Sequence, residues 1–362
     1  MKTLLLGCTV VLMTTASLAQ TPPLRVAIAG LAHGHVAGFF EHSLQRPDIQ
    51  LVGIAESDSA LASRYAGKFN LDRSIVFTDL ETMLQKTHPQ AVLAYSSTFD
   101  HRRIVEICAR HGIHVMMEKP LAVSYEDAVT MQTAAQAAKI HVLVNYETTW
   151  YNSNRTAYQL LHQGMLGELR KVVVHDGHQG PKEIGVPPEF FTWLNDPKLN
   201  GGGALYDFGC YGADLMTWLM DGKRPSTVTA VTQRFKPEIY NVDDEATIIL
   251  TYPKAQAILQ ASWNWPFDRK DMEVYGRTGY VITAGHDDVR LRLAGKPEER
   301  RAEAVAPPQT DSLTYLRGVL LEGAKPDGPS SLEINMVVAE ILDAARRSAA
   351  SGQTIRLERG QQ

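Results

Sequence analysis

An amine and a carboxyl group stand side by side in the segment 112-GIHVMMEKPLA-122, where an apolar run ends on Glu118, Lys119 and Pro120. A lysine is usually solvated on the protein surface. At the end of a buried parallel strand, however, it lies at the edge of the sheet where open α/β proteins bind ligands. Burial and a neighbouring cationic ring lower the pKa of such a lysine, which can then relay a proton. Lys119 is therefore the first candidate catalytic residue.

A second set of reactive groups follows three glycines in 201-GGGALYDFGCYGADLMTWL-219. Asp207, Tyr211 and Asp214 are four and three residues apart, so on a helix they share one face. Polar helix faces are usually solvated, but the glycines and the lysine upstream favour a substrate cleft. A nearby lysine cation lowers the pKa of a phenol, which can then take a hydroxyl proton. Asp207 and Tyr211 are therefore candidate residues of that cleft.

The elements that must position these groups differ between the two halves of the chain. From Leu24 to about Tyr146, short apolar runs alternate with helical patterns, which is typical of parallel strands buried on both faces. The apolar runs are 24–30, 50–56, 90–96, 113–117 and 140–146. The helices between them include one closed by Gly112 and one that begins at Ser124. The predicted fold class is α/β, with an N-terminal Rossmann doubly wound parallel sheet over 24–147.

The second half predicts an α+β domain over 148–357 with a large, mostly antiparallel open sheet. Longer runs with two-residue alternation occur at 168–177, 226–235, 244–253 and 256–266. A last helix over about 330–350 begins at Ser330, with Glu333 three residues on. Trp263 and Trp265 fall in an alternating run, and we expect them to face another subunit, so a homo-oligomer is predicted through this sheet.

The first strand runs into 30-GLAHGHVAG-38, which reads as a strand-to-helix turn that cradles a pyrophosphate. The G-x-G-x-x-G form is not met, because Ala32 holds the second position and Gly34 comes one place early. A plain tight turn is the alternative. Glu56 ends the second strand, where an acid holds the ribose hydroxyls, and no arginine follows it to accept a 2′-phosphate. The sequence thus predicts NAD in preference to NADP.

In this order, the blocks resemble the Gfo/Idh/MocA oxidoreductase family from about Leu24 to Leu357. The resemblance rests on 112-GIHVMMEKPLA-122, His101 in 100-DHRRIVEICARHG-112, Thr78-Asp79 before 80-LETML-84, and 201-GGGALYDFGCYGADL-215. It implies that Lys119 lies beside the nicotinamide and hydrogen-bonds the reacting hydroxyl, and that Glu118 orients Lys119 or the cofactor. Tyr211 stands where histidine is common in the family, although some members use tyrosine. The resemblance thus implies Lys119, Tyr211 and Asp207 as catalytic residues, and which of Lys119 and Tyr211 is the formal base stays open. The predicted cofactor-binding residues are Gly30, Ala32, His33, Gly34, His35, Glu56, Ser96, Ser97, His101, Glu118 and Lys119.

The segment 145-NYETTWYN-152 departs from the family by lacking its basic residues. Glu147, Trp150 and Tyr151 are candidates for a wall facing a sugar, since an aromatic face and a carboxylate suit a pyranose ring. Packing between the domains is an equal alternative for the two aromatic residues. His175 and His178 reach the cleft or are loop histidines. The predicted substrate-binding residues are Glu147, Trp150, His178, Tyr211 and Asp207.

Composition and the first twenty residues bound the remaining possibilities. A formal net charge of −4 gives no reason to expect nucleic acid or a lipid surface as a partner. Residues 1–19 have the layout of a cleavable secretory signal, and their apolar run is too short for a membrane span. Export to the periplasm or beyond is expected, and lipid attachment at Cys8 stays open. We expect no metal, and we expect Cys108 and Cys210 to be buried thiols without a disulfide.

The function that the resemblance implies is an exported, NAD-dependent oxidoreductase acting on a ring hydroxyl of a sugar or glycoside. Free NAD is scarce outside the cytoplasm, so the cofactor must stay bound or the cycle must be redox-neutral. The alternative is therefore a glycosidase that uses bound NAD for oxidation, elimination, hydration and reduction. A sugar sensor without catalysis is disfavoured because Lys119 is present.

Overall fold

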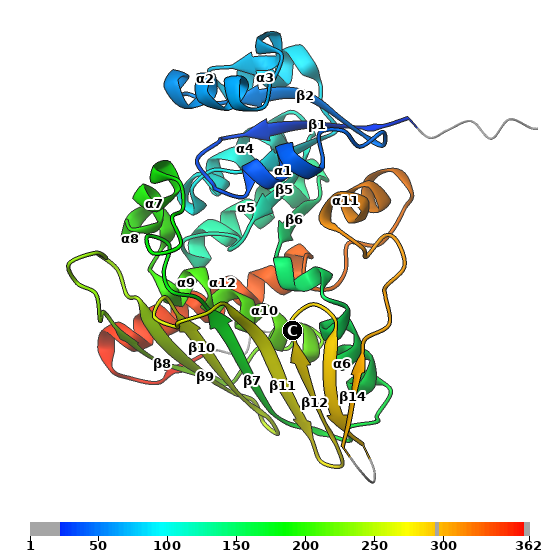
Figure 1. Ribbon diagram of the computed structural model, residues 1–362, viewed down its shortest axis with the longest axis vertical. Coiled ribbons are helices and arrows are strands. Elements are labelled where there is room, and N and C mark those ends of the chain that lie inside the picture. The colour runs from blue at the N-terminus through cyan, green and yellow to red at the C-terminus, as the bar shows by residue number, and fades with distance from the viewer. Residues whose placement is uncertain (1–21, 294–296, 358–362) are drawn as a thin grey trace, which may run out of the picture.

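The computed structural model of the protein describes residues 22–293 and 297–357. Two sheets lie one above the other, with helices between them (Figure 1). The signal-peptide prediction for residues 1–19, including Cys8, falls outside the described residues. Within those residues, no helix has the length and apolar character needed to cross a membrane.

The N-terminal sheet is parallel and six-stranded, in the order β3-β2-β1-β4-β5-β6. Its strands are β1 Leu24–Ala29, β2 Ile49–Ala55, β3 Val76–Phe77, β4 Ala91–Ala94, β5 His114–Glu118 and β6 Val142–Asn145. The connecting helices are α1 Val36–His42, α2 Ser59–Lys68, α3 Leu80–Thr87, α4 His101–Arg110 and α5 Tyr125–Ala138, with 3-10 turns η1 Arg73–Ile75 and η2 Thr98–Asp100. Strand β4 is buried along its whole length and β1 at every residue except Arg25, which is why they read as continuous apolar runs.

The second sheet has nine strands in the order β14-β13-β12-β11-β7-β10-β9-β8-β15 and is antiparallel except where β7 pairs with β10. Its strands are β7 Leu169–Gly177, β8 Thr227–Gln233, β9 Glu245–Thr251, β10 Gln256–Ser262, β11 Arg269–Gly276, β12 Tyr280–Ala284, β13 Asp288–Arg292, β14 Glu298–Arg301 and β15 Ile355–Arg356. The predicted fold class is therefore confirmed. The charged strand β14 forms one edge of the sheet.

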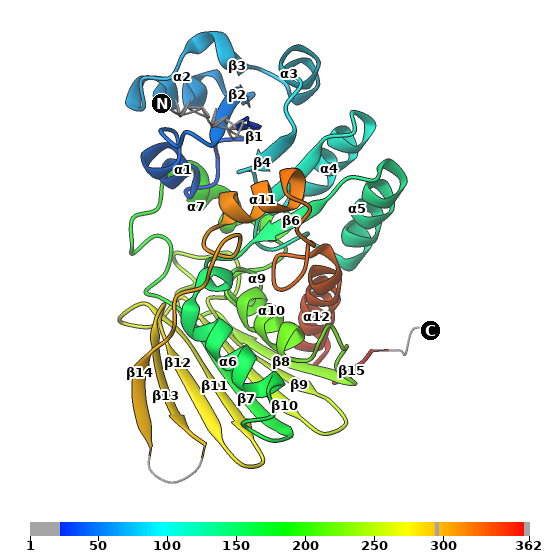
Figure 2. The same ribbon diagram turned by 90° about the vertical axis from the view of Figure 1, so that its right-hand side faces the viewer.

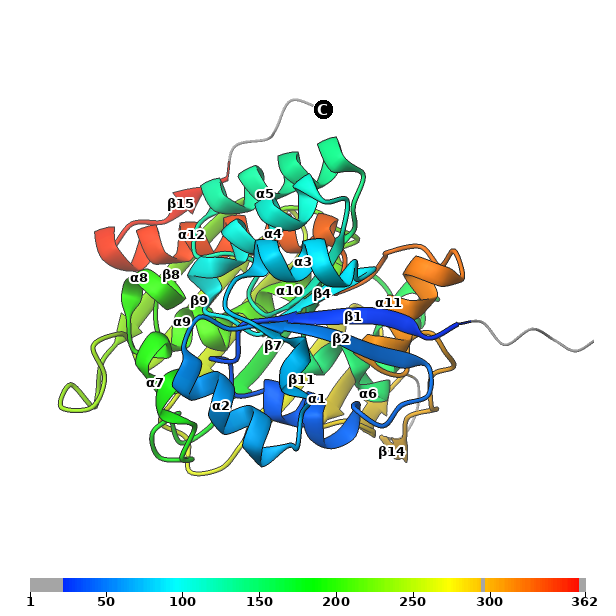
Figure 3. The same cartoon turned by 90° about the horizontal axis from the view of Figure 1, so that it is seen from above.

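Helices cover the face of this sheet that looks toward the Rossmann domain (Figure 2). They are α6 Asn152–His162, α9 Ala204–Asp207, α10 Gly209–Leu219 and α12 Leu332–Ser351, with η3 Glu147–Trp150 before α6. Seen from above, α7 Pro188–Leu194 and α8 Pro197–Asn200 lie at one end of the Rossmann sheet, and α11 Ser312–Leu321 lies toward the other (Figure 3). Alternate residues of β9 and β10 are buried and partly exposed, which fits one covered face.

The structure corrects two predictions about local structure and confirms a third. The last helix is capped by Ser331, whose hydroxyl accepts from the Ile334 N–H, rather than by Ser330. Strand β10 ends at Ser262, so Trp263 and Trp265 lie beyond it, and Trp263 is fully buried within its own chain. Cys108 and Cys210 are buried free thiols, as predicted.

Candidate active site

Lys119 and Asp207 form a buried ion pair where the two domains meet. Lys119 follows the carboxyl end of β5, and its ammonium contacts the Asp207 carboxylate closely and donates to the Asp207 backbone oxygen at 2.8 Å. The second carboxylate oxygen of Asp207 accepts from the Trp263 indole N–H at 2.9 Å. All three side chains are buried. Asp207 therefore holds Lys119 in place, with both of its carboxylate oxygens engaged by the protein.

Two ammonium groups lie close to the ring of Tyr211. The Nζ of Lys119 is 5.0 Å from the ring centroid and the Nζ of Lys270 is 5.3 Å from it. Tyr146 packs edge-on against the same ring, with 5.5 Å between centroids. Lys119 and Tyr211 are 92 residues apart in the sequence, and the fold brings the amine and the phenol ring together.

The expected directions of the pKa shifts at this pair were wrong for the protein alone. Burial acts to lower the pKa of Lys119, but the Asp207 carboxylate outweighs it and the pKa is raised. Burial raises the pKa of Tyr211 well above its ordinary value, and the carboxylate of Glu147 acts in the same direction. Both groups therefore hold their protons at neutral pH. For Tyr211 the sequence argument counted the lysine cation and not the burial of the phenol, and for Lys119 it left out the Asp207 carboxylate.

A cavity of about 430 Å³ at the carboxyl edge of the Rossmann sheet contains five of the predicted cofactor residues. These are Gly30, Ala32, Glu56, Ser96 and Ser97. Gly30 has a φ of +81°, and a Cβ there would lie 3.1 Å from Ser96, so only glycine fits. The Glu56 carboxylate is fixed by the N–H groups of Leu31 and Asp58, both at 2.8 Å. An open glycine turn and a fixed acid at the end of β2 fit a dinucleotide.

Other predicted cofactor residues surround the turn that carries Lys119. His35 Nδ1 lies 3.0 Å from one Glu118 oxygen, and Asn145 donates to the other at 3.0 Å. The ring of His101 contacts the carbonyl oxygens of Pro120 and Leu121, both at 3.2 Å, so it supports the turn that carries Lys119. Glu118 and His101 therefore position Lys119.

Ligand atoms of His33, His35 and Glu118 lie within 4.8 Å of one another, close enough to share a cation. Two histidines and a carboxylate are a set that zinc accepts. The sequence argument, which expected no metal, missed this cluster because it looked only for regular ligand spacing. His33 also packs against Phe190, with 4.4 Å between ring centroids. A Cβ at Gly34 would lie 2.7 Å from the same phenyl ring.

A second cavity, of about 420 Å³, opens beside Lys270 and contains some of the predicted substrate residues. Glu147, Tyr151 and His178 line it. Trp150 does not: its indole N–H donates to Asn145 at 3.0 Å and its ring packs 5.7 Å from that of Tyr315. Of the two alternatives for Trp150, the structure therefore shows packing between the domains.

The histidines at the end of β7 separate. His178 lines the second cavity and its ring stands edge-on to Phe208 at 4.8 Å. His175 instead pairs with Asp271 at 2.7 Å and is not among the lining residues.

Sequence reasoning missed Lys270, Trp263 and Asp176 as members of this cluster. Lys270 stands directly opposite Asp176 in the β7–β11 pairing, and its ammonium contacts Glu147. The ending of an apolar alternating strand on Asp176 was a signal that could have found one of them. Lys270 and Trp263 carried no signal, because only the sheet pairing and the strand end bring them to the cleft.

Asp214 lines neither cavity, and of the three residues expected on one helix face only Tyr211 shares a continuous helix with it. The helix is interrupted at Phe208 between α9 and α10, and Asp214 is completely buried. Neither carboxyl oxygen has a hydrogen-bond partner among the residues that the structure describes. Burial raises the pKa of Asp214 well above its ordinary value.

Replacing Asp214 with asparagine is expected to flatten the pH dependence of stability. The unfolded chain loses the proton near pH ~4, whereas the folded protein keeps it, so the free energy of unfolding falls as pH rises above that value. Asparagine removes this contribution. Urea titrations of both proteins between pH ~4.5 and ~8 measure it, and equal pH slopes would contradict a protonated Asp214.

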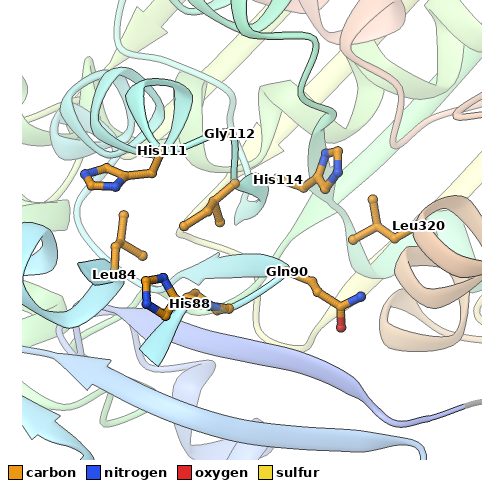
Figure 4. Close-up of a pocket in the computed structure, with 9 residues that line it drawn as sticks. Leu84, His88, Gln90, His111, Gly112, His114 and Leu320 are labelled. Carbon is orange, nitrogen blue, oxygen red and sulfur yellow. The ribbon is translucent and has the colours of Figure 1, made fainter. Parts of the chain in front are cut away.

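A third hollow, of about 330 Å³, lies at the opposite edge of the Rossmann sheet (Figure 4). His88, His111 and His114 line it at the amino ends of β4 and β5, together with Leu320 of α11. Ligands of open α/β sheets bind at the carboxyl ends of the strands. We therefore assign the site to the other edge.

The fold and the site define a two-domain protein with a dinucleotide-binding Rossmann domain and a sheet domain that closes over its carboxyl edge. The oxidoreductase family with an NAD-binding Rossmann fold matches residues 24–146, and the GFO/IDH/MocA C-terminal domain matches residues 154–282. Together these matches cover more than half of the chain, which therefore belongs to the Gfo/Idh/MocA family.

Several relatives have known activities. Trans-1,2-dihydrobenzene-1,2-diol dehydrogenase of Macaca fuscata fuscata is 26% identical over 58% of this chain and 59% of its own length. The chain thus spans about three fifths of that relative. The Xenopus tropicalis dehydrogenase of the same name is 25% identical over 84% and 91% of the two chains. Scyllo-inositol 2-dehydrogenase (NADP(+)) of Bacillus subtilis is 24% identical over 78% and 83%.

Solved structures share the fold over nearly the whole chain. Aldose-aldose oxidoreductase from Caulobacter crescentus, complexed with glycerol, has a TM-score of 0.79 and 23% identity, covering 92% of this chain and 100% of its own. An inositol dehydrogenase homolog from Azotobacter vinelandii, complexed with NAD+, has a TM-score of 0.79 and 19% identity, covering 92% and 97%. At these identities the likeness concerns the fold.

Proposed function

We propose that the protein is an NAD-dependent oxidoreductase that transfers hydride at a ring CH–OH group of a sugar or glycoside. The observation that carries this proposal is the meeting of Lys119 with Tyr211, whose ring also contacts Lys270 on the wall of the second cavity. Relatives whose names give inositol, diol and aldose substrates support the substrate class.

The residues of the chain divide the proton chemistry among them. A bound nicotinamide supplies or accepts the hydride. Lys119, held by Asp207, donates a hydrogen bond to the substrate oxygen, and Tyr211 exchanges a proton with the same oxygen. Because both groups hold their protons in the protein alone, the site is poised to donate a proton, as reduction of a ketone requires. Oxidation of the hydroxyl uses the reverse transfer.

Purified protein is to be tested with NAD and a panel that includes D-glucose, D-xylose and myo-inositol. An absorbance rise from reduced nicotinamide with at least one polyol is the expected result. The reverse reaction, with reduced cofactor and the matching ketone, checks the direction. Failure of every member in both directions, in protein that binds the cofactor, would remove the proposal.

NAD is proposed in preference to NADP because the Glu56 carboxylate lies where an acid binds the ribose hydroxyls, and its charge repels a 2′-phosphate. Arg103 of α4 also lines the dinucleotide cavity, and its position in the sequence did not indicate this. We expect NAD to bind at least about tenfold more tightly than NADP, a difference of roughly 1.4 kcal/mol. Fluorescence titrations measure both constants, and Glu56→Gln is expected to narrow the difference. A lower dissociation constant for NADP would reverse the assignment.

The cofactor is proposed to stay bound through turnover, and α7 supports this proposal. The Trp193 indole donates to the Ala32 carbonyl at 3.2 Å, and Glu189 pairs with Arg64 of α2 at 2.5 Å. Trp193 and Glu189 also line the dinucleotide cavity. Helix α7 thus connects the sheet domain to the turn that carries the cofactor.

Trp193→Ala is expected to weaken cofactor binding by about 2 kcal/mol, roughly thirtyfold, because a large aromatic side chain leaves the cavity wall. Trp193→Phe is the matched control: it keeps most of the wall, loses the hydrogen bond to Ala32, and is expected to have a smaller effect. Cofactor retained after gel filtration and the dissociation rate are the measurements. Equal retention of the cofactor in all three proteins would show that α7 does not hold the cofactor in place.

A redox-neutral glycosidase is the second candidate. Glu147 favours it, because this half-exposed carboxylate in the second cavity is an acid–base group that hydride transfer alone does not need. Purified protein incubated with a nitrophenyl glycoside tests it. Release of nitrophenol without added oxidant supports the glycosidase, whereas accumulation of reduced nicotinamide with free sugar supports the dehydrogenase.

Export and self-association are further proposals. The signal-like residues 1–19 support the first, and the uncovered face of the nine-stranded sheet supports a homo-oligomer. Cell fractionation with N-terminal sequencing, and light scattering of the purified protein, are the direct measurements.

A further inference from the structure

Asp176 is a buried acid near the centre of the site for which the proposed chemistry has no use. Its side chain is 2% exposed, and neither oxygen has a hydrogen-bond partner within residues 22–293 and 297–357. Burial raises its pKa well above the ordinary value, with Asp271 and Glu147 adding to this effect and Lys270 opposing it. An unpaired buried carboxylate is costly, so Asp176 is a protonated acid in this arrangement.

Its nearest cation has another partner. Lys270 of β11 stands directly opposite Asp176 of β7, and residues so paired have Cβ atoms roughly 4.5–5.5 Å apart. The Lys270 ammonium nevertheless contacts Glu147, which also accepts the Tyr151 hydroxyl at 2.6 Å. Glu147 has 50% of its side chain exposed, so it is the carboxylate that a ligand in the second cavity meets.

We propose that Glu147 and Asp176 are alternative partners of Lys270, exchanged when hydroxyl groups of a ligand bind Glu147. Lys270 then turns to Asp176, whose carboxyl group releases one proton to water and becomes the new carboxylate of the ion pair. Glu147 stays ionised and accepts hydrogen bonds from the ligand. No redox step is involved. The role of the ligand rests on the proposed function, whereas the exchange of ion pairs does not.

The charged and titratable groups that act electrostatically on Asp176 make Lys270 the ammonium that can turn. They are Lys270 and Asp271 from β11, Glu147 and Tyr151 near η3, Lys119 after β5, and Cys210 of α10. Of the two lysines among them, Lys119 is already held by two contacts with Asp207. Because Lys270 also lies 5.3 Å from the Tyr211 ring centroid, the exchange changes the field at the candidate catalytic phenol when the cavity fills.

Infrared spectroscopy of the full chain tests the exchange without a substrate. Asp176→Asn is expected to remove one protonated-carboxyl band from the wild-type spectrum at pH ~7. Glu147→Gln deprives Lys270 of its ionic partner, so the same band is expected to disappear as Asp176 ionises. Adding Lys270→Gln to Glu147→Gln is expected to restore the band, because the attracting cation is gone.

Asp214 is the matched control, since it is also a buried acid without a hydrogen-bond partner among the described residues. Its band, identified with Asp214→Asn, is expected to persist in Glu147→Gln. An Asp176 band that survives in Glu147→Gln would overturn the exchange, as would its absence from the wild type. Loss of both acid bands would indicate general loosening and would also count against it. None of these results depends on turnover. A failure of the ion-pair exchange can therefore be distinguished from a failure of the proposed enzyme activity.

Discussion

Lys119→Ala is expected to lower kcat by about a thousandfold or more while leaving a cofactor site that still binds dinucleotide. A positioned proton-transfer group contributes roughly 10²–10⁴-fold, and Lys119 also supplies the positive charge next to the reacting oxygen. Steady-state rates with the best substrate of the sugar panel, together with a cofactor titration, measure both quantities. Full activity in this variant would reject the active site proposed here.

The same substitution also removes one partner of a buried ion pair. Asp207 would keep the Trp263 hydrogen bond but lose its cation, a change that typically costs about 3–5 kcal/mol. The double variant Lys119→Met with Asp207→Asn separates stability from chemistry, because it leaves no unpaired charge. It is expected to recover most of the free energy of unfolding and none of the activity. Recovery of activity with stability would make Lys119 a structural residue.

Tyr211→Phe is expected to lower kcat by roughly 10²–10⁴-fold with little change in stability. The ring and its packing against Tyr146 and the two ammonium groups remain, and the variant removes only the phenol oxygen. Thermal unfolding and steady-state kinetics at several pH values are the measurements. A rise in KM alone, with kcat unchanged, would show that the phenol binds substrate without exchanging its proton.

Tyr206→Phe is the matched control for the loss of a buried hydroxyl. Its phenol donates to the Val123 carbonyl at 3.0 Å, so the substitution is expected to cost about 1 kcal/mol of stability. Because Tyr206 lines neither cavity, kcat is expected to stay near the wild-type value. Opposite outcomes in the two tyrosine variants would assign chemistry to Tyr211 and packing to Tyr206.

The predictions that followed from periodicity and from the two local blocks describe the structure well. Buried parallel strands read as apolar runs, and the sheet placed Lys119 at its carboxyl edge. The arguments that failed involved partners distant in sequence. Trp263 was expected at a subunit contact and instead donates a hydrogen bond to Asp207. For Trp150 the sequence left a cavity wall and interdomain packing open, and the ring packs against Tyr315.

The chain by itself determined the two-domain architecture and the glycine turn with its acid at Glu56, because periodicity and short motifs are local properties. That Lys119 meets Tyr211 was expected from the resemblance to the family, since the two residues are 92 positions apart. Only the tertiary structure decided that Asp207 is bound to Lys119, that Lys270 stands opposite Asp176, and that Asp214 is completely buried. Protonation depends on every charge within a few ångströms and on burial, and both come from strand pairing and helix packing.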